Sequence, residues 1–247
     1  MAEFGKGPPG PEEVLRPAES VALGWLLDGL GLAMVLGMGW LVAFTIADLT
    51  LGRLAPGTRG SVPVPPLPAF LLGFAGLDYL QYWTHRLFHG RVLWRFHLLH
   101  HTLARMNGSG AFRHSLWECL LNPVSWCHGA IAWLLTEPSW YLIAVSTGIL
   151  LDVWRHAPLE THATGHLRRV LHFLLVTPED HALHHGRLAV PANFGGNLKV
   201  WDRLHGTYQA PAAGRGTCGV EHTDGILRLL FGAARRPFAI PGPPDGA

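Results

Sequence analysis

The amino-acid sequence predicts an all-α integral membrane protein with about four transmembrane helices and a histidine-rich helical cap on the cytoplasmic side. The chain of 247 residues is 49% hydrophobic but only 15% charged, whereas soluble domains carry about 25% charged residues. Long uncharged runs recur along it, and about 20 apolar residues suffice to cross the hydrocarbon core of a bilayer. The chain also contains 16 histidines, whose two polar ring nitrogens require a role in so apolar a protein.

The uncharged runs locate the expected membrane helices. The first runs from Gly29 to Ala47. A second helix is expected to begin near Pro68, after a proline-rich segment, and to continue to His85. The residues from Cys119 to Thr136 and from Ser139 to Leu151 are uncharged again. The Glu137-Pro138 pair between these two runs predicts the short turn of a helical hairpin.

The chain is expected to form one membrane domain, residues 21–208, between a disordered N-terminal arm, residues 1–20, and a C-terminal tail, residues 209–247. Arginines concentrate in residues 86–113 and after residue 151, so the positive-inside rule places these segments and both termini in the cytoplasm. An alanine- and arginine-rich chain with few lysines favours a bacterial inner membrane. The net charge of +2 is too small for a nucleic-acid partner.

Three histidine clusters carry the chemistry. Residues i, i+3 and i+4 share one face of a helix, so we expect the imidazoles of each cluster to converge on one point. Neutral imidazole binds Zn, Cu, Fe and Ni. Eight such ligands exceed what one ion can hold, so the pattern predicts two metal ions. The clusters are His85 and His89; His97, His100 and His101; and His181, His184 and His185.

The same clusters argue against a zinc hydrolase. Its motif is HExxH, with a glutamate as general base. Leu98 and Ala182 occupy the glutamate position in the two HxxHH runs.

Five segments in the half of the chain between residues 78 and 208 carry a family resemblance. They are Asp78 to His89, Trp94 to His101, Ala111 to Glu118, Thr177 to His185, and a closing segment made of Asn193 to Leu198 and Trp201 to Tyr208. In this order they resemble the histidine boxes and the closing signature of the fatty acid hydroxylase/sterol desaturase superfamily. The third segment departs from the family pattern, because Ser115 stands where relatives usually have proline.

The resemblance implies an integral-membrane di-iron enzyme. Two Fe ions and O₂ would oxidise a lipid, either a fatty acyl chain, a sterol or a related isoprenoid lipid. Electrons would come from an external donor, such as a cytochrome b5-, ferredoxin- or reductase-like partner. Both hydroxylation and desaturation are compatible with the sequence.

The resemblance also implies a ninth ligand between the last membrane helix and the final box. His156 occupies that position, and the i, i+4 pair His162 and His166 is the alternative. His114 is expected beside the ligands. Asp78 and Asp202 are candidates for accepting hydrogen bonds from imidazole N–H groups, the usual role of carboxylates around a metal site.

A membrane metal transporter or metal-binding protein is the alternative function for the same histidines. A transporter places its ligands near the middle of the bilayer. The histidine clusters instead lie on arginine-rich segments next to helix ends, which favours the oxygenase.

Overall fold

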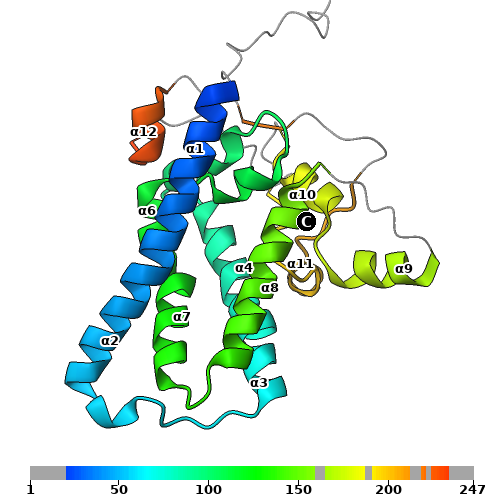
Figure 1. Ribbon diagram of the computed structural model, residues 1–247. Coiled ribbons are helices and arrows are strands. Elements are labelled where there is room, and N and C mark those ends of the chain that lie inside the picture. Colours follow the sequence, from blue (N-terminus) through cyan, green and yellow to red (C-terminus); the bar gives the residue numbers. More distant parts are fainter. Residues whose placement is uncertain (1–20, 159–164, 187–190, 212–217, 221–223, 234–247) are drawn as a thin grey trace, which may run out of the picture.

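The computed structural model describes residues 21–158, 165–186, 191–211, 218–220 and 224–233 (Figure 1). Within these residues the regular elements are helices, and β-structure is limited to isolated bridges such as Val62 with Leu135. The prediction of an all-α fold is therefore confirmed. The N-terminal arm, residues 1–20, lies outside the described residues.

A bundle of long helices forms the body of the protein (Figure 1). Helical segments follow one another without a break from Val21 to Leu54 and from Pro66 to Phe88. The first run consists of α1 (Val21–Met34), η1 (Val35–Val42) and α2 (Ala43–Leu54), and the second of α3 (Pro66–Leu71), η3 (Leu72–Gly76) and α4 (Leu77–Phe88). The second run agrees with the helix expected from Pro68 to His85.

The expected helical hairpin is present as α7 (Pro123–Leu134) and α8 (Ser139–His156). Pro123 is the first residue of α7, where its missing N–H costs nothing. Asn122 caps this helix, because its side chain accepts a hydrogen bond from the Val124 N–H at 3.0 Å. This cap separates α7 from the short α6 (Leu116–Leu121). The second arm extends beyond the expected Leu151 and ends at His156.

Close packing joins the two halves of the bundle. A Cβ atom added to Gly129 on α7 would lie 2.6 Å from the carbonyl oxygen of Ala43 on α2, so only glycine permits this approach. A core cluster further along the bundle includes Leu77, Tyr141 and Val145. Close packing within the bundle therefore fixes the positions of α4 and α8, which carry histidines.

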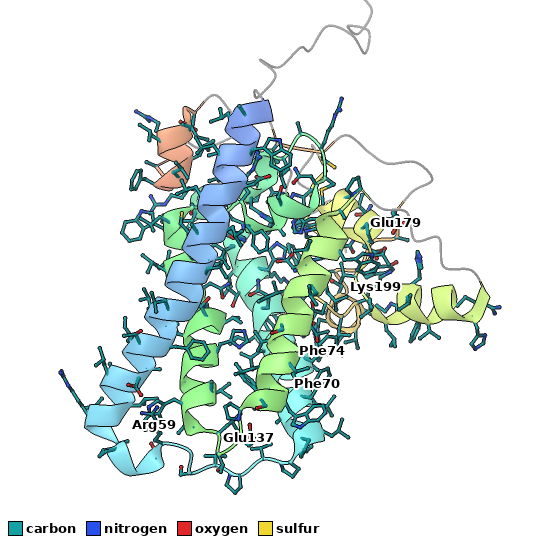
Figure 2. All side chains as sticks on the ribbon, viewed as in Figure 1. Arg59, Phe70, Phe74, Glu137, Glu179 and Lys199 are labelled. Atoms are coloured by element: carbon teal, nitrogen blue, oxygen red, sulfur yellow. The ribbon has the colours of Figure 1, made fainter. Side chains whose placement is uncertain are left out.

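Short elements cover one end of the bundle, and the histidines lie there. Lys199 and Glu179 lie near this end in Figure 2, whereas Arg59 and Glu137 lie at the opposite end. The short elements are α5 (Trp94–His97), η4 (His100–Thr102), η5 (Gly108–Phe112), α9 (Gly165–Leu174), α10 (Pro178–His184), α11 (Val200–Leu204), α12 (Ile226–Leu230) and η2 (Pro56–Thr58). In Figure 1, α10 and α12 lie toward the histidine end, and α9 projects from the side of the bundle. From the tail, Leu229 of α12 packs in one cluster with Trp94 and Leu98.

None of the described helices is both long and apolar enough to cross a membrane. The four transmembrane crossings therefore stay a prediction.

Candidate metal centre

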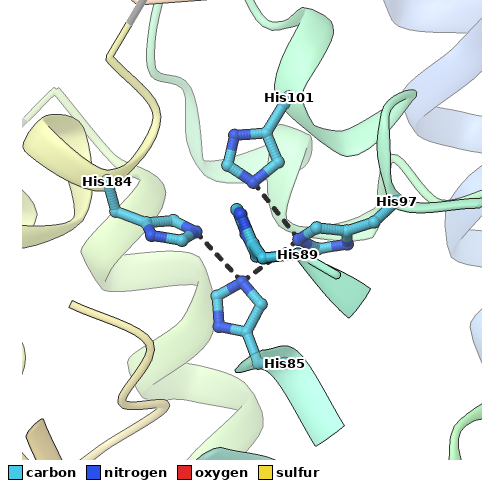
Figure 3. A group of neighbouring side chains, drawn as sticks. All are labelled: His85, His89, His97, His101 and His184. Atoms are coloured by element: carbon cyan, nitrogen blue, oxygen red, sulfur yellow. Dashed lines mark hydrogen bonds between the residues drawn. The ribbon is translucent and has the colours of Figure 1, made fainter. Parts of the chain in front are cut away.

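Nine histidines gather into two buried groups at the capped end of the bundle. Within each group, the nitrogens that could bind a metal all lie within 4.8 Å of one another. Site A, drawn in Figure 3, consists of His85, His89, His97, His101 and His184, and site B of His100, His156, His181 and His185. The sites adjoin, since the rings of His101 and His185 stack with centroids 4.4 Å apart.

Each HxxHH run divides between the two sites. His97 and His101 belong to site A, but His100 belongs to site B. In the other run, His181 and His185 belong to site B and His184 to site A. The expectation that the three imidazoles of one run converge on one point is therefore wrong. Residues i+3 and i+4 are about 100° apart on a helix, which is enough to direct two neighbouring side chains to different centres.

Local structure fixes where the third histidine cluster begins. The side chains of Thr177 and Asp180 form a capping box at the start of α10, and Pro178 is the first residue of the helix. This combination is a strong helix-start signal. It places His181 one turn into α10 and His185 at its C-terminal cap.

Hydrogen bonds from the outer ring nitrogen orient four of the imidazoles. Each acceptor fixes the Nδ1–H tautomer and leaves the lone pair of Nε2 directed into the site, as in known metal centres. In site A, Nδ1 of His85 lies 2.9 Å from the Phe194 carbonyl, that of His97 lies 2.6 Å from Glu118 Oε1, and that of His184 lies 2.8 Å from the Ala192 carbonyl. In site B, Nδ1 of His156 lies 2.9 Å from the Asp152 carbonyl.

The inner nitrogens are spaced as ligands of one ion would be. In site A, Nε2 of His85 lies 3.1 Å from that of His97 and 3.0 Å from that of His184 (Figure 3). In site B, Nε2 of His181 lies 3.0 Å from that of His156 and 3.1 Å from that of His185. Two nitrogens at right angles, each about 2.1 Å from one ion, are about 3.0 Å apart. The donor sets therefore fit a metal.

An unpartnered nitrogen in site A supports the same fit. Nε2 of His89 is buried and has no hydrogen-bond partner among the described residues. A buried polar atom without a partner is costly, and coordination of a metal would satisfy its lone pair.

Burial keeps the imidazoles in the form that binds metal. Burial lowers the pKa of His184 to about 3. Burial, followed by the neighbouring histidines, also lowers the pKa values of His100, His101, His181 and His185 well below their usual range. All five are therefore neutral at pH 7, as metal ligation requires.

Among the residues that the structure describes, Glu118 is the carboxylate that contacts two histidines at this centre. Its Oε2 lies 3.1 Å from Nδ1 of His114, in addition to the contact of Oε1 with His97. Burial alone would raise the pKa of Glu118, but His114 and His97 outweigh burial and lower it to about 2. For His114, burial alone would lower the pKa, but the neighbouring Glu118 carboxylate outweighs burial, and the pKa of His114 is raised. His114 also stacks on His100, with centroids 4.9 Å apart.

Asp78 and Asp202 act on the backbone and not on an imidazole. Asp78 accepts hydrogen bonds from the N–H groups of Asn197 and Leu198 and from the Trp201 indole, at 2.7, 3.0 and 2.8 Å. Asp202 accepts from the N–H groups of Phe194 and Gly195 at 2.8 and 2.7 Å. Both carboxylates hold the loop whose Phe194 carbonyl faces His85. Their expected direct contact with an imidazole is therefore corrected to an indirect one.

The structure brings His156, and not His166, together with the other candidate ligands. His156 is 1% exposed and lies within site B. His166 is exposed on α9, and His162 lies outside the described residues. Two isolated histidines lie apart from both sites: His128 bonds to the Tyr141 hydroxyl at 2.6 Å, and His205 stacks on Tyr82.

The acceptors that orient the imidazoles were not predicted from the sequence. Glu118 and Asp152 carried a usable signal, because they lie four residues after His114 and four residues before His156, on the same helical faces. The carbonyl groups of Ala192 and Phe194 carried none, because every residue has a carbonyl.

A cavity of about 230 Å³ leads from the histidines into the bundle. Histidines of both sites, including His97 and His181, line one part of this cavity, which we call its head. Leu77, Val124 and Val145 are among the apolar residues that line its length. An apolar chain in this cavity could therefore bring one of its carbons to the histidine sites.

Comparison with known proteins defines the class. The family described as "Fatty acid hydroxylase" matches residues 70–207, more than half of the chain. The chain therefore belongs to the fatty acid hydroxylase family.

The individual relatives are modification enzymes of different lipids. The chain is 32% identical over 161 residues to the alkylglycerol monooxygenase of Danio rerio, covering 64% of this chain and 34% of that protein. It is 27% identical over 180 residues to the ornithine lipid hydroxylase OlsE of Rhizobium tropici, covering 70% and 51%. It is 28% identical over 168 residues to the C-4 methylsterol oxidase of Schizosaccharomyces pombe, covering 62% and 52%. The match to the alkylglycerol monooxygenases spans about a third of their length, and no solved structure matches.

Proposed function

We propose that this protein is an O₂-dependent non-haem di-iron oxidoreductase that hydroxylates or desaturates a membrane lipid. The observation that carries the proposal is the pair of adjoining, all-histidine sites at the head of an apolar cavity. His85, His89, His97, His101 and His184 would hold one iron, and His100, His156, His181 and His185 the other. The names of the three relatives support a lipid as substrate.

Oxidation of an unactivated C–H bond requires a redox metal, because acid–base groups alone cannot attack it. Iron bound by neutral imidazoles would supply O₂ activation. Hydroxylation then consumes one O₂, two electrons and two protons, and gives one hydroxyl group and one water. The chain's own contribution is to orient the imidazoles through Glu118, Asp152 and the two backbone carbonyls, and to exclude bulk water by burying both sites.

The electrons are proposed to come from an external cytochrome b5-, ferredoxin- or reductase-like donor. We place the histidine end on the cytoplasmic side of a bacterial inner membrane, where such donors are available. The arginine-rich parts of the chain, residues 86–113 and the residues after 151, support this orientation by the positive-inside rule.

Membrane embedding is supported by the apolar surface of the bundle. Large apolar side chains are exposed along the continuous run from α1 to α2, among them Trp25, Leu36 and Leu49. Apolar surface of this extent on a folded chain marks contact with lipid or protein. The amphipathic α9 adds exposed Val170 and Phe173, the pattern of a helix that lies on a membrane surface.

Lipid analysis of cells with and without the chain tests the function. Mass spectrometry should find lipids that have gained one oxygen atom or lost two hydrogen atoms only when the chain is present. A chain carrying His85→Ala and His181→Ala should yield neither product. Lipid profiles that are identical with the intact chain and the double variant would refute the proposal.

A further inference from the structure

Polar side chains interrupt the apolar lining of the cavity about one helical turn from the histidines. Gln81 precedes His85 by four residues on α4, so it lies on the same helical face about 6 Å away along the axis. Asn122, at the start of α7, donates from Nδ2 to Oε1 of Gln81 at 3.2 Å. Gln81, Asn122 and Ser125 all line the cavity.

These groups have unused hydrogen-bonding capacity. Among the described residues, the side chain of Gln81 makes only the bond to Asn122, which uses its oxygen. Both N–H groups of its amide therefore remain available. The hydroxyl of Ser125 makes no side-chain hydrogen bond within the described part of the chain. A hydrocarbon that fills the cavity would leave these groups without hydrogen-bond partners, which is unfavourable, whereas a ligand with an oxygen acceptor would pair with them.

The charges around the cavity favour a neutral acceptor. Arg155 is the only lysine or arginine among the described residues that line it. The charge of Arg155 is already balanced by Asp152, whose Oδ1 lies 2.7 Å from Nη2, and Nη1 lies 3.3 Å from Asn197 Oδ1, so that only Nε has no partner among the described residues. A carboxylate or phosphate placed beside Gln81 would therefore lose its hydration without gaining a free cation.

We infer that Gln81 and Ser125 form a specificity site for a neutral oxygen of the substrate, an ether, ester or hydroxyl oxygen a few bonds from the carbon that is oxidised. The inference rests on the proposed function for the position of oxidation, but the binding preference does not require turnover. The specificity site predicts that oxidation occurs close to the polar part of a lipid and not in the middle of an unsubstituted hydrocarbon chain.

Two probes that differ by one atom test the inference. Dioctyl ether and heptadecane have the same length, and the ether has an oxygen where the hydrocarbon has CH₂. The detergent-purified full chain should bind the ether about tenfold more tightly, which corresponds to about 1.4 kcal/mol. Gln81→Leu should abolish this preference by weakening ether binding, and Ser125→Ala should reduce it. Gln209→Leu is the matched control, because Gln209 is exposed and does not line the cavity; it should keep the full preference.

The outcomes separate the inference from the proposed function. Equal binding of the two probes by the unmodified chain, or an undiminished preference in both Gln81→Leu and Ser125→Ala, would overturn the specificity site. In turnover, oxidation of the ether should occur within about three carbons of its oxygen, and a uniform spread of products along the chain would also overturn it. A preserved binding preference without any lipid oxidation would refute the oxygenase and leave the specificity site standing.

Discussion

Nδ1 of His97 lies 2.6 Å from Oε1 of Glu118, and both side chains are almost completely buried. Because a carboxylate can only accept, this contact fixes the proton on Nδ1 and directs Nε2 of His97 into site A. The second oxygen of Glu118 contacts His114, which stacks on His100 of site B. One carboxylate therefore supports a histidine of each site, one directly and one through His114.

Replacing Glu118 should weaken metal binding without removing a ligand. Glu118→Gln keeps the size of the side chain but loses its charge, so His97 is held less firmly. We expect metal affinity to fall by about 10- to 100-fold, as for other groups that orient metal ligands, measured by competition with a chelator. Glu137→Gln, at the far end of the bundle (Figure 2), is the control and should bind metal as the unmodified chain does. Unchanged affinity in Glu118→Gln would show that the contact does not orient His97.

Two adjacent histidines should affect different ions. His100→Ala opens site B and His101→Ala opens site A, so each variant should lose mainly one ion, and the double variant should lose both. Elemental analysis of the purified chains gives the metal content directly. If a spectroscopic signature of each site shows that His100→Ala and His101→Ala deplete the same ion, the division of this HxxHH run between sites A and B is wrong.

The ninth position can be tested by comparing His156 with His166. His156→Ala removes one of four nitrogens from site B, and we expect loss of lipid oxidation together with a lower metal content. His166→Ala changes an exposed residue of α9 and should leave both unchanged. Wild-type metal content in His156→Ala would show that His156 is not a ligand and that another residue holds this position.

The buried ion pair between Asp180 of α10 and Lys199 should contribute more to the stability of the fold than an exposed pair does. Nζ of Lys199 lies 2.5 Å from Oδ2 of Asp180, and both side chains are at most 3% exposed. Lys199→Met would leave the carboxylate buried and unpaired, which costs about 3–5 kcal/mol. We expect a clearly lower melting temperature in detergent. Arg59→Met is the matched control, because the Arg59–Asp48 pair is exposed and such pairs contribute about 0–1 kcal/mol. A similar melting temperature for both variants would contradict the role of burial.

The helices and the histidine clusters could be predicted from the sequence, because uncharged runs and i, i+4 spacing are local signals. The division of each HxxHH run could not. A helical wheel puts His97, His100 and His101 within an arc of about 100°, which is compatible either with one shared centre or with two adjacent ones, and only the fold shows that both runs use two. The partners of Asp78 were also hidden, since Asn197 and Leu198 are more than a hundred residues away in the chain. Only the folded structure shows that this carboxylate closes a backbone loop.

The division of each histidine run determines what sets the spacing of the two sites. His100 and His101 are consecutive residues, and so are His184 and His185, and each pair has one member in each site. Consecutive Cα atoms are 3.8 Å apart whatever the rest of the fold does. Covalent geometry therefore limits the separation of the two sites at both of these pairs. The width of the cavity, in contrast, depends on the packing of separate helices. Motion of the bundle helices, or a lipid that pushes them apart, should therefore change the width of the cavity more than the distance between the two sites. The same scaffold could therefore accept substrates of different width with little change in the spacing of the two histidine sites.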